Sequence, residues 1–155
     1  MVNKEKEATA WVEDFKVRAA ESGKKIKEKI GEDATVTVAE NFNKQFYIYG
    51  DNWGRGTEIL YQEMGLKMPE KVKETALEPG YYAISQEVLG DYAGDYVIFS
   101  MFQDQDNSFT DAAWFKDLEA VKNGHLFEVN ANAFYFNDPI TLEHQLKFFE
   151  EKFLQ

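Results

Sequence analysis

Cysteine is absent from all 155 residues of this sequence. The chain therefore has no disulfide framework, no thiolate nucleophile and no zinc site with cysteine ligands. Histidine is almost as scarce, since His125 and His144 are the only two. Their spacing is not that of a metal-binding pair. We therefore predict no metal ion that the protein itself coordinates.

Long apolar runs are also missing, and positive charge is low. No segment approaches the roughly 20 apolar residues of a membrane helix, and the first residues, MVNKEKEATAW, contain no apolar region of a signal peptide. The 28 acidic and 17 basic residues give a net charge of −11, with no basic patch that would favour nucleic acid. Hydrophobic residues make up 44% and aromatic residues 15%, which argues against disorder. This composition predicts one acidic globular domain.

Sequence motifs for catalysis, nucleotides and calcium are incomplete. Gly54 and Gly56 follow a predicted strand, as in a dinucleotide-binding loop, but Ile59 stands where the third glycine belongs. Residues 104–108 begin with the spacing of a calcium loop, but Phe109 replaces its glycine. No serine lies in a nucleophile elbow. We predict neither catalytic residues nor metal ligands.

Alternating strand and helix patterns predict the fold. Strands are expected at 35–39, 46–49, 81–84, 95–101 and 125–130, and helices at 3–30, 59–64, 86–92, 111–123 and 140–154. Ser85 and Asp111 are candidate N-caps for two of these helices. Residues 69–80 fit either a short helix or a loop. The alternation predicts an α/β fold, a mainly parallel sheet flanked by helices, with a long N-terminal helix.

The segment from Phe46 to Leu66 carries the strongest binding signal. Trp53 and Arg55 lie between a predicted strand and a predicted helix, and Arg55 is one of only two arginines. Ligands of open α/β sheets bind in loops at the carboxyl ends of strands. Tryptophan and arginine are frequent recognition anchors. The alternative is that Trp53 packs onto the core while Arg55 extends into solvent.

The sequence YGDNWGRGTEILYQEMGLKMPEKV resembles the start of the C-terminal lobe of ferric-siderophore-binding lipoproteins from Gram-positive bacteria. Among these it is most similar to the binders of ferric hydroxamates such as ferrichrome and desferrioxamine. The resemblance continues in YYAISQEVLGDYAGDYVIFS, WFKDLEAVKNGHLFEV and YFNDPITLEHQLKFFEEKF. It implies a single Rossmann-like lobe at 31–155, an interlobe connector helix at 3–30, and an N-terminal lobe that this chain lacks.

The same resemblance implies a function. The family members are the siderophore-binding components of ABC iron importers, and they deliver ferric-hydroxamate complexes to a membrane permease. The full-length parent would be extracytoplasmic and held at the membrane by a lipid anchor upstream of this chain. The ligand would be an Fe(III)–siderophore complex, with no cofactor bound directly by the protein, because the siderophore already fills the coordination sphere of the iron.

Site residues also follow from the resemblance. It implies that Tyr47, Trp53, Arg55, Tyr135 and Phe136 line the ligand cleft. Guanidinium N–H groups suit the partly negative oxygens of a hydroxamate, and aromatic rings suit its apolar arms. Phe136 stands where close relatives usually carry tryptophan, so its ring is kept but the indole N–H is lost. Core packing is the alternative for the aromatic run at 134–136, of which we expect one or two residues to be buried.

Glu87 has two interpretations. A glutamate in the first turn of a helix is favoured by the helix dipole. The resemblance implies instead that Glu87 docks on arginines of the permease.

Two other classes of function remain open at this stage. The Gly50–Gly56 loop could serve a small α/β enzyme or a nucleotide-binding domain, or the aromatic residues could only contact another protein. If the binding interpretation holds, we expect Arg55, as a loop residue, to contribute little to folding. We also expect the connector helix to expose apolar side chains, Trp11 among them.

Overall fold

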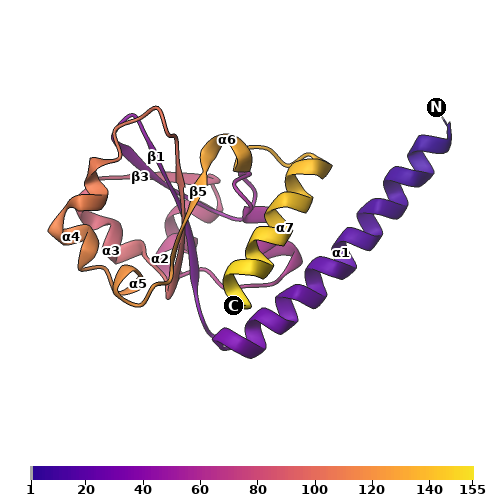
Figure 1. Ribbon diagram of the computed structural model, residues 1–155, viewed down its shortest axis with the longest axis horizontal. Coiled ribbons are helices and arrows are strands. Elements are labelled where there is room, and N and C mark those ends of the chain that lie inside the picture. The colour runs from indigo at the N-terminus through magenta and orange to yellow at the C-terminus, as the bar shows by residue number, and fades with distance from the viewer. Residues whose placement is uncertain (1) are drawn as a thin grey trace.

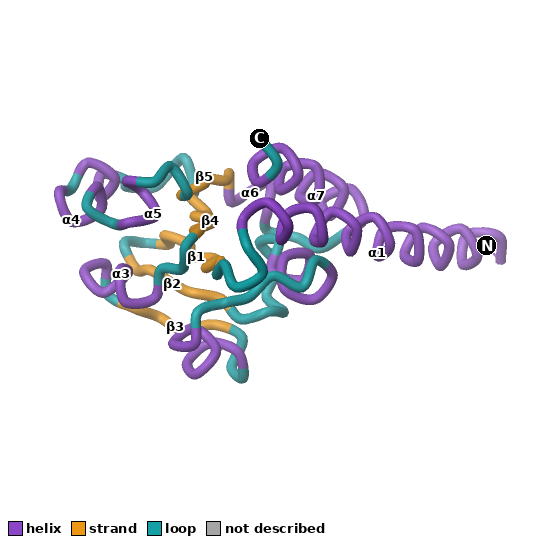
Figure 2. The backbone as a smooth tube through the Cα atoms, turned by 90° about the horizontal axis from the view of Figure 1, so that it is seen from below, coloured by secondary structure: helices purple, strands orange, loops and turns teal. Residues whose placement is uncertain are grey.

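The sheet is the centre of the structure, a computed structural model that describes residues 2–155. Five strands lie in the order β3-β2-β1-β4-β5 (Figure 2). They are β1 (Val36–Phe42), β2 (Gln45–Tyr49), β3 (Tyr81–Ile84), β4 (Tyr96–Met101) and β5 (Leu126–Asn130). β1, β4 and β5 are parallel neighbours, whereas β2 runs antiparallel to both β1 and β3. The expected α/β fold with a mainly parallel sheet is confirmed.

A tight turn explains the one reversed strand. Asn43 and Lys44 connect β1 to β2 and both have positive φ angles, 51° and 65°. A two-residue turn of this kind matches the twist of an antiparallel pair. Ile48 pairs with Ala39, so β2 runs back toward the amino end of β1. The loop after β2 must therefore cross the sheet face to reach the carboxyl ends of β1 and β4.

Helices cover both faces of the sheet (Figure 2). One face carries α1 (Val2–Ile30), the π-helix η1 (Glu58–Glu63), α6 (Ala131–Phe134) and α7 (Pro139–Phe153). The other carries α2 (Glu70–Val72), the π-helix η2 (Lys73–Leu77), the 3₁₀ helices η3 (Gln86–Val88) and η4 (Ser108–Asp111), α3 (Leu89–Tyr92), α4 (Ala113–Lys116) and α5 (Glu119–Lys122). Within residues 2–155, no helix combines the length and the apolarity that a bilayer span requires.

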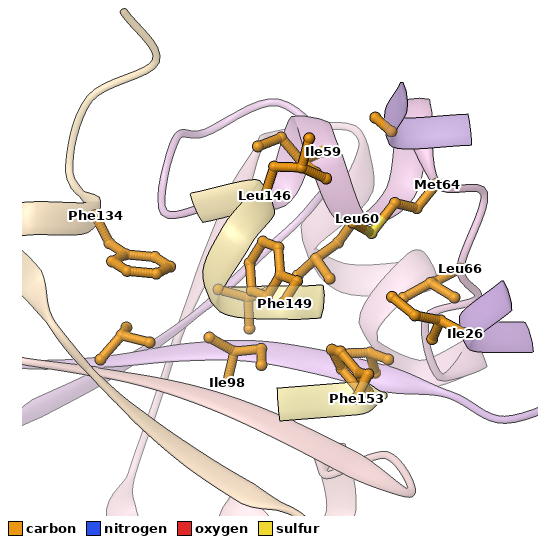
Figure 3. Close-up of a cluster of buried hydrophobic side chains, with 14 of the residues drawn as sticks. Ile26, Ile59, Leu60, Met64, Leu66, Ile98, Phe134, Leu146, Phe149 and Phe153 are labelled. Carbon is orange, nitrogen blue, oxygen red and sulfur yellow. The ribbon is translucent and has the colours of Figure 1, made fainter. Parts of the chain in front are cut away.

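The core on the α1 side joins segments that are distant in sequence. Ile26 of α1, Leu60 of η1, Phe149 of α7 and Ile98 of β4 belong to one apolar cluster, and all four are fully buried (Figure 3). Burying side chains of this size stabilises a fold by about 1.5–3 kcal/mol each. This packing fixes η1, and with it the loop that precedes η1.

Only the C-terminal part of α1 packs on the core, because its first turns project beyond the rest of the molecule (Figures 1 and 2). Phe15 is buried, but Val12 and Val17 are exposed. Trp11 is half-buried: its ring stacks on Phe15, and its indole N–H donates to Glu143 of α7 at 3.0 Å. Exposed apolar side chains on this helix were expected, although they are valines rather than Trp11.

Two local predictions are wrong. The helix expected at 111–123 is interrupted, because Ala112 and Leu118 have extended backbone conformations with ψ near 143° and 133°. Asp111 is the last residue of η4 and not a helix cap. Ser85 does occupy the N-cap position of η3, but its side chain makes no capping hydrogen bond.

Candidate functional site

A hollow of about 300 Å³ opens on the α7 side of the sheet, where β1 and β4 end. Its wall is formed by Glu40, Phe42, Tyr47, Tyr49, Trp53, Arg55, Tyr81, Phe102 and Tyr135. Glu40 and Phe42 come from the end of β1, and Phe102 directly follows β4. Residues of β2 and β3, the loop after β2 and the residue after α6 complete the wall. The hollow is the part of this face that α1, η1 and α7 leave uncovered.

Three consecutive positive φ angles shape the loop, at Gly54 (68°), Arg55 (58°) and Gly56 (85°). A non-glycine residue adopts this conformation at a cost, so surrounding contacts must hold Arg55 in place. The two glycines are required by close approach as well. A Cβ atom on Gly56 would lie 2.6 Å from the ring of Phe149, and one on Gly54 would lie 2.5 Å from the carbonyl oxygen of Tyr135. The loop is thus pressed against α7 and the end of α6.

Arg55 is buried and forms a paired hydrogen bond with Glu40. Its Nε donates to Oε2 of Glu40 at 3.0 Å and its Nη2 to Oε1 at 2.9 Å. The hydroxyl group of Tyr49 also donates to Oε1, and that of Ser100 to Oε2, each at 2.8 Å. Glu40 and Arg55 are only 2% and 8% exposed. An arginine extended into solvent is therefore excluded, and this burial argues against the expectation that Arg55 contributes little to folding.

The guanidinium of Arg55 is also held between two aromatic rings. Its Cζ lies 4.7 Å from the ring centroid of Tyr49 and 4.2 Å from that of Tyr135. Nη1 donates to the carbonyl oxygen of Trp53 at 3.0 Å. Three of the five N–H groups of the guanidinium thereby form hydrogen bonds with other residues of the described range, 2–155. One N–H group on each Nη nitrogen has no partner among these residues.

The protonation states favour this arrangement. Burial lowers the pKa of Arg55, but hydrogen bonding to Glu40 and nearby acidic groups outweigh burial and leave the pKa raised. Burial, followed by the charge of Glu40, raises the pKa of Tyr49. At neutral pH Arg55 is therefore a cation, and Tyr49 keeps the proton that it donates to Glu40.

Trp53 forms an aromatic wall together with two tyrosines. It is 43% exposed, and its ring lies 5.1 Å from that of Tyr81, which in turn lies 6.1 Å from that of Tyr47. A Cβ atom on Gly80 would lie 2.5 Å from the Trp53 ring, so the indole rests directly on the backbone there. Trp53 is a wall of the hollow and not a core residue.

The aromatic run after α6 divides between the core and the site. Phe134 is buried, Tyr135 lines the hollow, and Phe136 is 61% exposed. Phe136 packs against Tyr135 at 5.0 Å but does not line the hollow. Gln145 of α7 donates its amide hydrogens to the carbonyl oxygens of Phe134 and Phe136, at 3.1 and 3.2 Å. Those two bonds fix the backbone on both sides of Tyr135.

Glu87 lies apart from the hollow, in η3 beyond the carboxyl end of β3. Its side chain is exposed and makes no ion pair with another residue of the described chain. Among residues 2–155, no hydrogen bond or ion pair recorded for the side chain of Glu87 ties it to the fold.

The sequence analysis did not identify Glu40, whose carboxylate binds Arg55 of the loop after β2. A signal was present: Val36, Val38 and Glu40 alternate along one strand and share one face. A carboxylate on a buried face requires a cationic or hydrogen-bonding partner. The chain has only two arginines, so Arg55 was the obvious candidate partner.

The buried ion pair predicts a large effect on stability. Arg55→Met should lower the free energy of unfolding by about 3–5 kcal/mol, because the carboxylate of Glu40 would remain buried without its cation. Urea denaturation followed by circular dichroism measures this difference. The double variant Glu40→Gln, Arg55→Met should regain much of the loss. A loss below about 1 kcal/mol in the single variant would show that the pair does not hold the loop.

Three comparisons place the chain among known proteins. A family model described as periplasmic binding protein matches residues 1–133. The iron(3+)-hydroxamate-binding protein FhuD of Bacillus subtilis is 38% identical over 156 residues, which cover 97% of this chain and 49% of that protein. The structure of FhuD2 of Staphylococcus aureus with bound ferrioxamine B superposes on this chain with a TM-score of 0.91 at 39% identity. The match covers 99% of this chain and 60% of the FhuD2 chain.

A more distant structure shares the fold. FeuA of Bacillus subtilis, solved with ferri-bacillibactin and described as a triscatecholate siderophore binding protein, gives a TM-score of 0.79 at 25% identity, over 99% of this chain and 55% of its own. The chain spans about half the length of the curated relatives it matches. These matches are to binding proteins and not to enzymes, and they show that the chain belongs to the periplasmic binding protein family.

Proposed function

We propose that this chain is the C-terminal lobe of a siderophore-binding protein that delivers ferric-hydroxamate complexes to an ABC importer. The observation that carries the proposal is the base of the hollow. There Glu40 binds Arg55, two N–H groups of Arg55 have no partner among the described residues, and aromatic rings surround the guanidinium. The relatives named for iron–hydroxamate binding support the same ligand class.

The chemistry of the ligand fits these groups. A hydroxamate siderophore supplies the oxygens that coordinate Fe(III), so the protein has only to hold the complex. The free N–H groups of Arg55 would donate to partly negative hydroxamate oxygens in charge-assisted hydrogen bonds. Tyr47, Trp53 and Tyr135 would pack on the apolar arms of the siderophore, and Phe136 would extend this wall outward.

The hollow would be one wall of a larger cleft. We assign residues 3–30 to an interlobe connector and 31–155 to the C-terminal lobe. The projecting start of α1, with Val12 and Val17 exposed, supports a second lobe against this helix. So does the greater length of the relatives. The complete protein would act outside the cytoplasm, anchored by lipid.

Titration of this chain with a gallium(III) hydroxamate tests the proposal. Ga(III) has the charge of Fe(III) and is diamagnetic, so the complex with desferrioxamine B allows NMR detection of weak binding. We expect shifts at Tyr47, Trp53 and Arg55, with an affinity about 10³-fold or more below that of a two-lobe protein, because one wall buries far less ligand. The absence of shifts at millimolar ligand, or shifts with ATP instead, would contradict the proposal. Binding at full strength would contradict a shared cleft.

Trp53→Ala should weaken binding of the gallium complex about five- to thirtyfold, because a large apolar contact is lost. The melting temperature should stay close to that of the wild type, since the ring is partly exposed; a buried tryptophan would instead cost about 3–5 kcal/mol of stability.

Tyr81 and Tyr82 provide a matched control for this effect. They are adjacent in β3, equally exposed at 43% and 42%, and point to opposite faces of the sheet. Tyr81→Ala should weaken binding, whereas Tyr82→Ala should not. Equal losses in both variants would place the ligand elsewhere.

Glu87→Ala should leave siderophore affinity unchanged and reduce iron uptake by cells that carry the complete two-lobe protein. The reason is that an exposed, unpaired carboxylate can pair with arginines of a permease. Radioactive iron uptake at matched protein levels measures the effect, with Glu78→Ala as the control at another exposed glutamate. Normal uptake by the Glu87 variant would leave Glu87 as a helix-end charge only.

A further inference from the structure

The hollow is electrically neutral although it contains an arginine. Among its lining residues only Glu40 and Arg55 are charged; the other seven are aromatic. Glu40 accepts four hydrogen bonds, two on each oxygen, and forms an ion pair with Arg55. Its charge lies in direct contact with the charge of Arg55 and cancels it. Arg55 thus offers N–H donors in a hollow whose two charged residues together carry no net charge.

Tris-hydroxamate and tris-catecholate complexes of Fe(III) differ in net charge. Three singly charged hydroxamates balance Fe(III) and give a neutral core. Three doubly charged catecholates leave a net charge of −3. A neutral hollow gives such a trianion no compensation for the water it would lose on binding. The net charge of −11 on the whole chain opposes it further.

We propose that Glu40 determines the specificity of this site: by cancelling the charge of Arg55, it makes the hollow accept neutral ferric complexes and reject tris-catecholate trianions. This inference rests on the proposed function and refines it. The donors of Arg55 recognise oxygen in either class of complex, whereas the charge of Glu40 discriminates between them. Specificity then comes from an unfavourable interaction with the wrong ligand.

Glu40→Gln tests this role, because glutamine keeps nearly the same shape and leaves Arg55 as an uncompensated cation. The probes are the gallium(III) complexes of bacillibactin and of N-acetylated desferrioxamine B, whose acetyl group removes the pendant ammonium. The readout is the ratio of the two dissociation constants from NMR titration. We expect this ratio to shift toward bacillibactin by about tenfold or more, and the shift to shrink as salt is added.

Ser100→Ala is the matched control. It removes one hydrogen bond to the same carboxylate but leaves the charge of Glu40 in place, so the ratio should stay within about twofold of the wild type. An unchanged ratio in a Glu40→Gln protein with a native NMR spectrum would overturn the inference, as would an equal shift in Ser100→Ala. If the wild type bound neither complex, the proposed function would fail, and this inference with it.

A second series keeps the inference testable if Glu40→Gln does not fold. Phe42 lines the hollow and is partly exposed, so its substitution leaves the buried pair intact. Phe42→Lys should shift the ratio toward bacillibactin and Phe42→Glu away from it, each relative to Phe42→Gln. The same ratio in all three variants would show that charge in the hollow does not select the ligand, and would overturn the proposal.

Discussion

The ion pair between Glu40 and Arg55 connects the parts of the molecule that form the site. Glu40 lies on β1 and accepts hydrogen bonds from Tyr49 on β2 and Ser100 on β4. Arg55 brings the loop after β2 onto this cluster. A buried carboxylate without its cation is strongly unfavourable, so the loop and the sheet stabilise each other. The same contacts hold Arg55 at a positive φ that it would not adopt alone.

The reversed direction of β2 explains why the loop that follows it needs an anchor on the sheet. The turn at Asn43 and Lys44 reverses β2, and the loop that follows begins near the amino end of β1. It reaches the carboxyl end only by crossing the sheet face. Two anchors guide it there: η1 is fixed in the core between α1 and α7, and Arg55 is fixed on Glu40. The hollow is the surface that remains between these anchors and the ends of β1 and β4.

The open side of the hollow agrees with a binding module that encloses its ligand from two sides. The chain covers about half the length of its curated relatives, and α1 extends past the packed core with valines exposed. By contrast, the far face of the sheet is closed by short helices over an aromatic cluster around Phe46, Phe99 and Phe109. Residues 2–155 therefore form a buried apolar cluster on each face of the sheet and leave one open hollow.

The sequence by itself determined the five strands, the two long helices and the α/β class, because alternation and helical periodicity are local properties that packing reinforces here. It also singled out Trp53 and Arg55. It did not predict the break at Leu118, where the backbone is extended although no proline or glycine marks it. Only the tertiary structure decided what Arg55 does, since its partner Glu40 lies 15 residues earlier on a strand whose neighbours cannot be read from a single sequence. Burial of that pair, a long-range contact, determines the shape and the charge of the site.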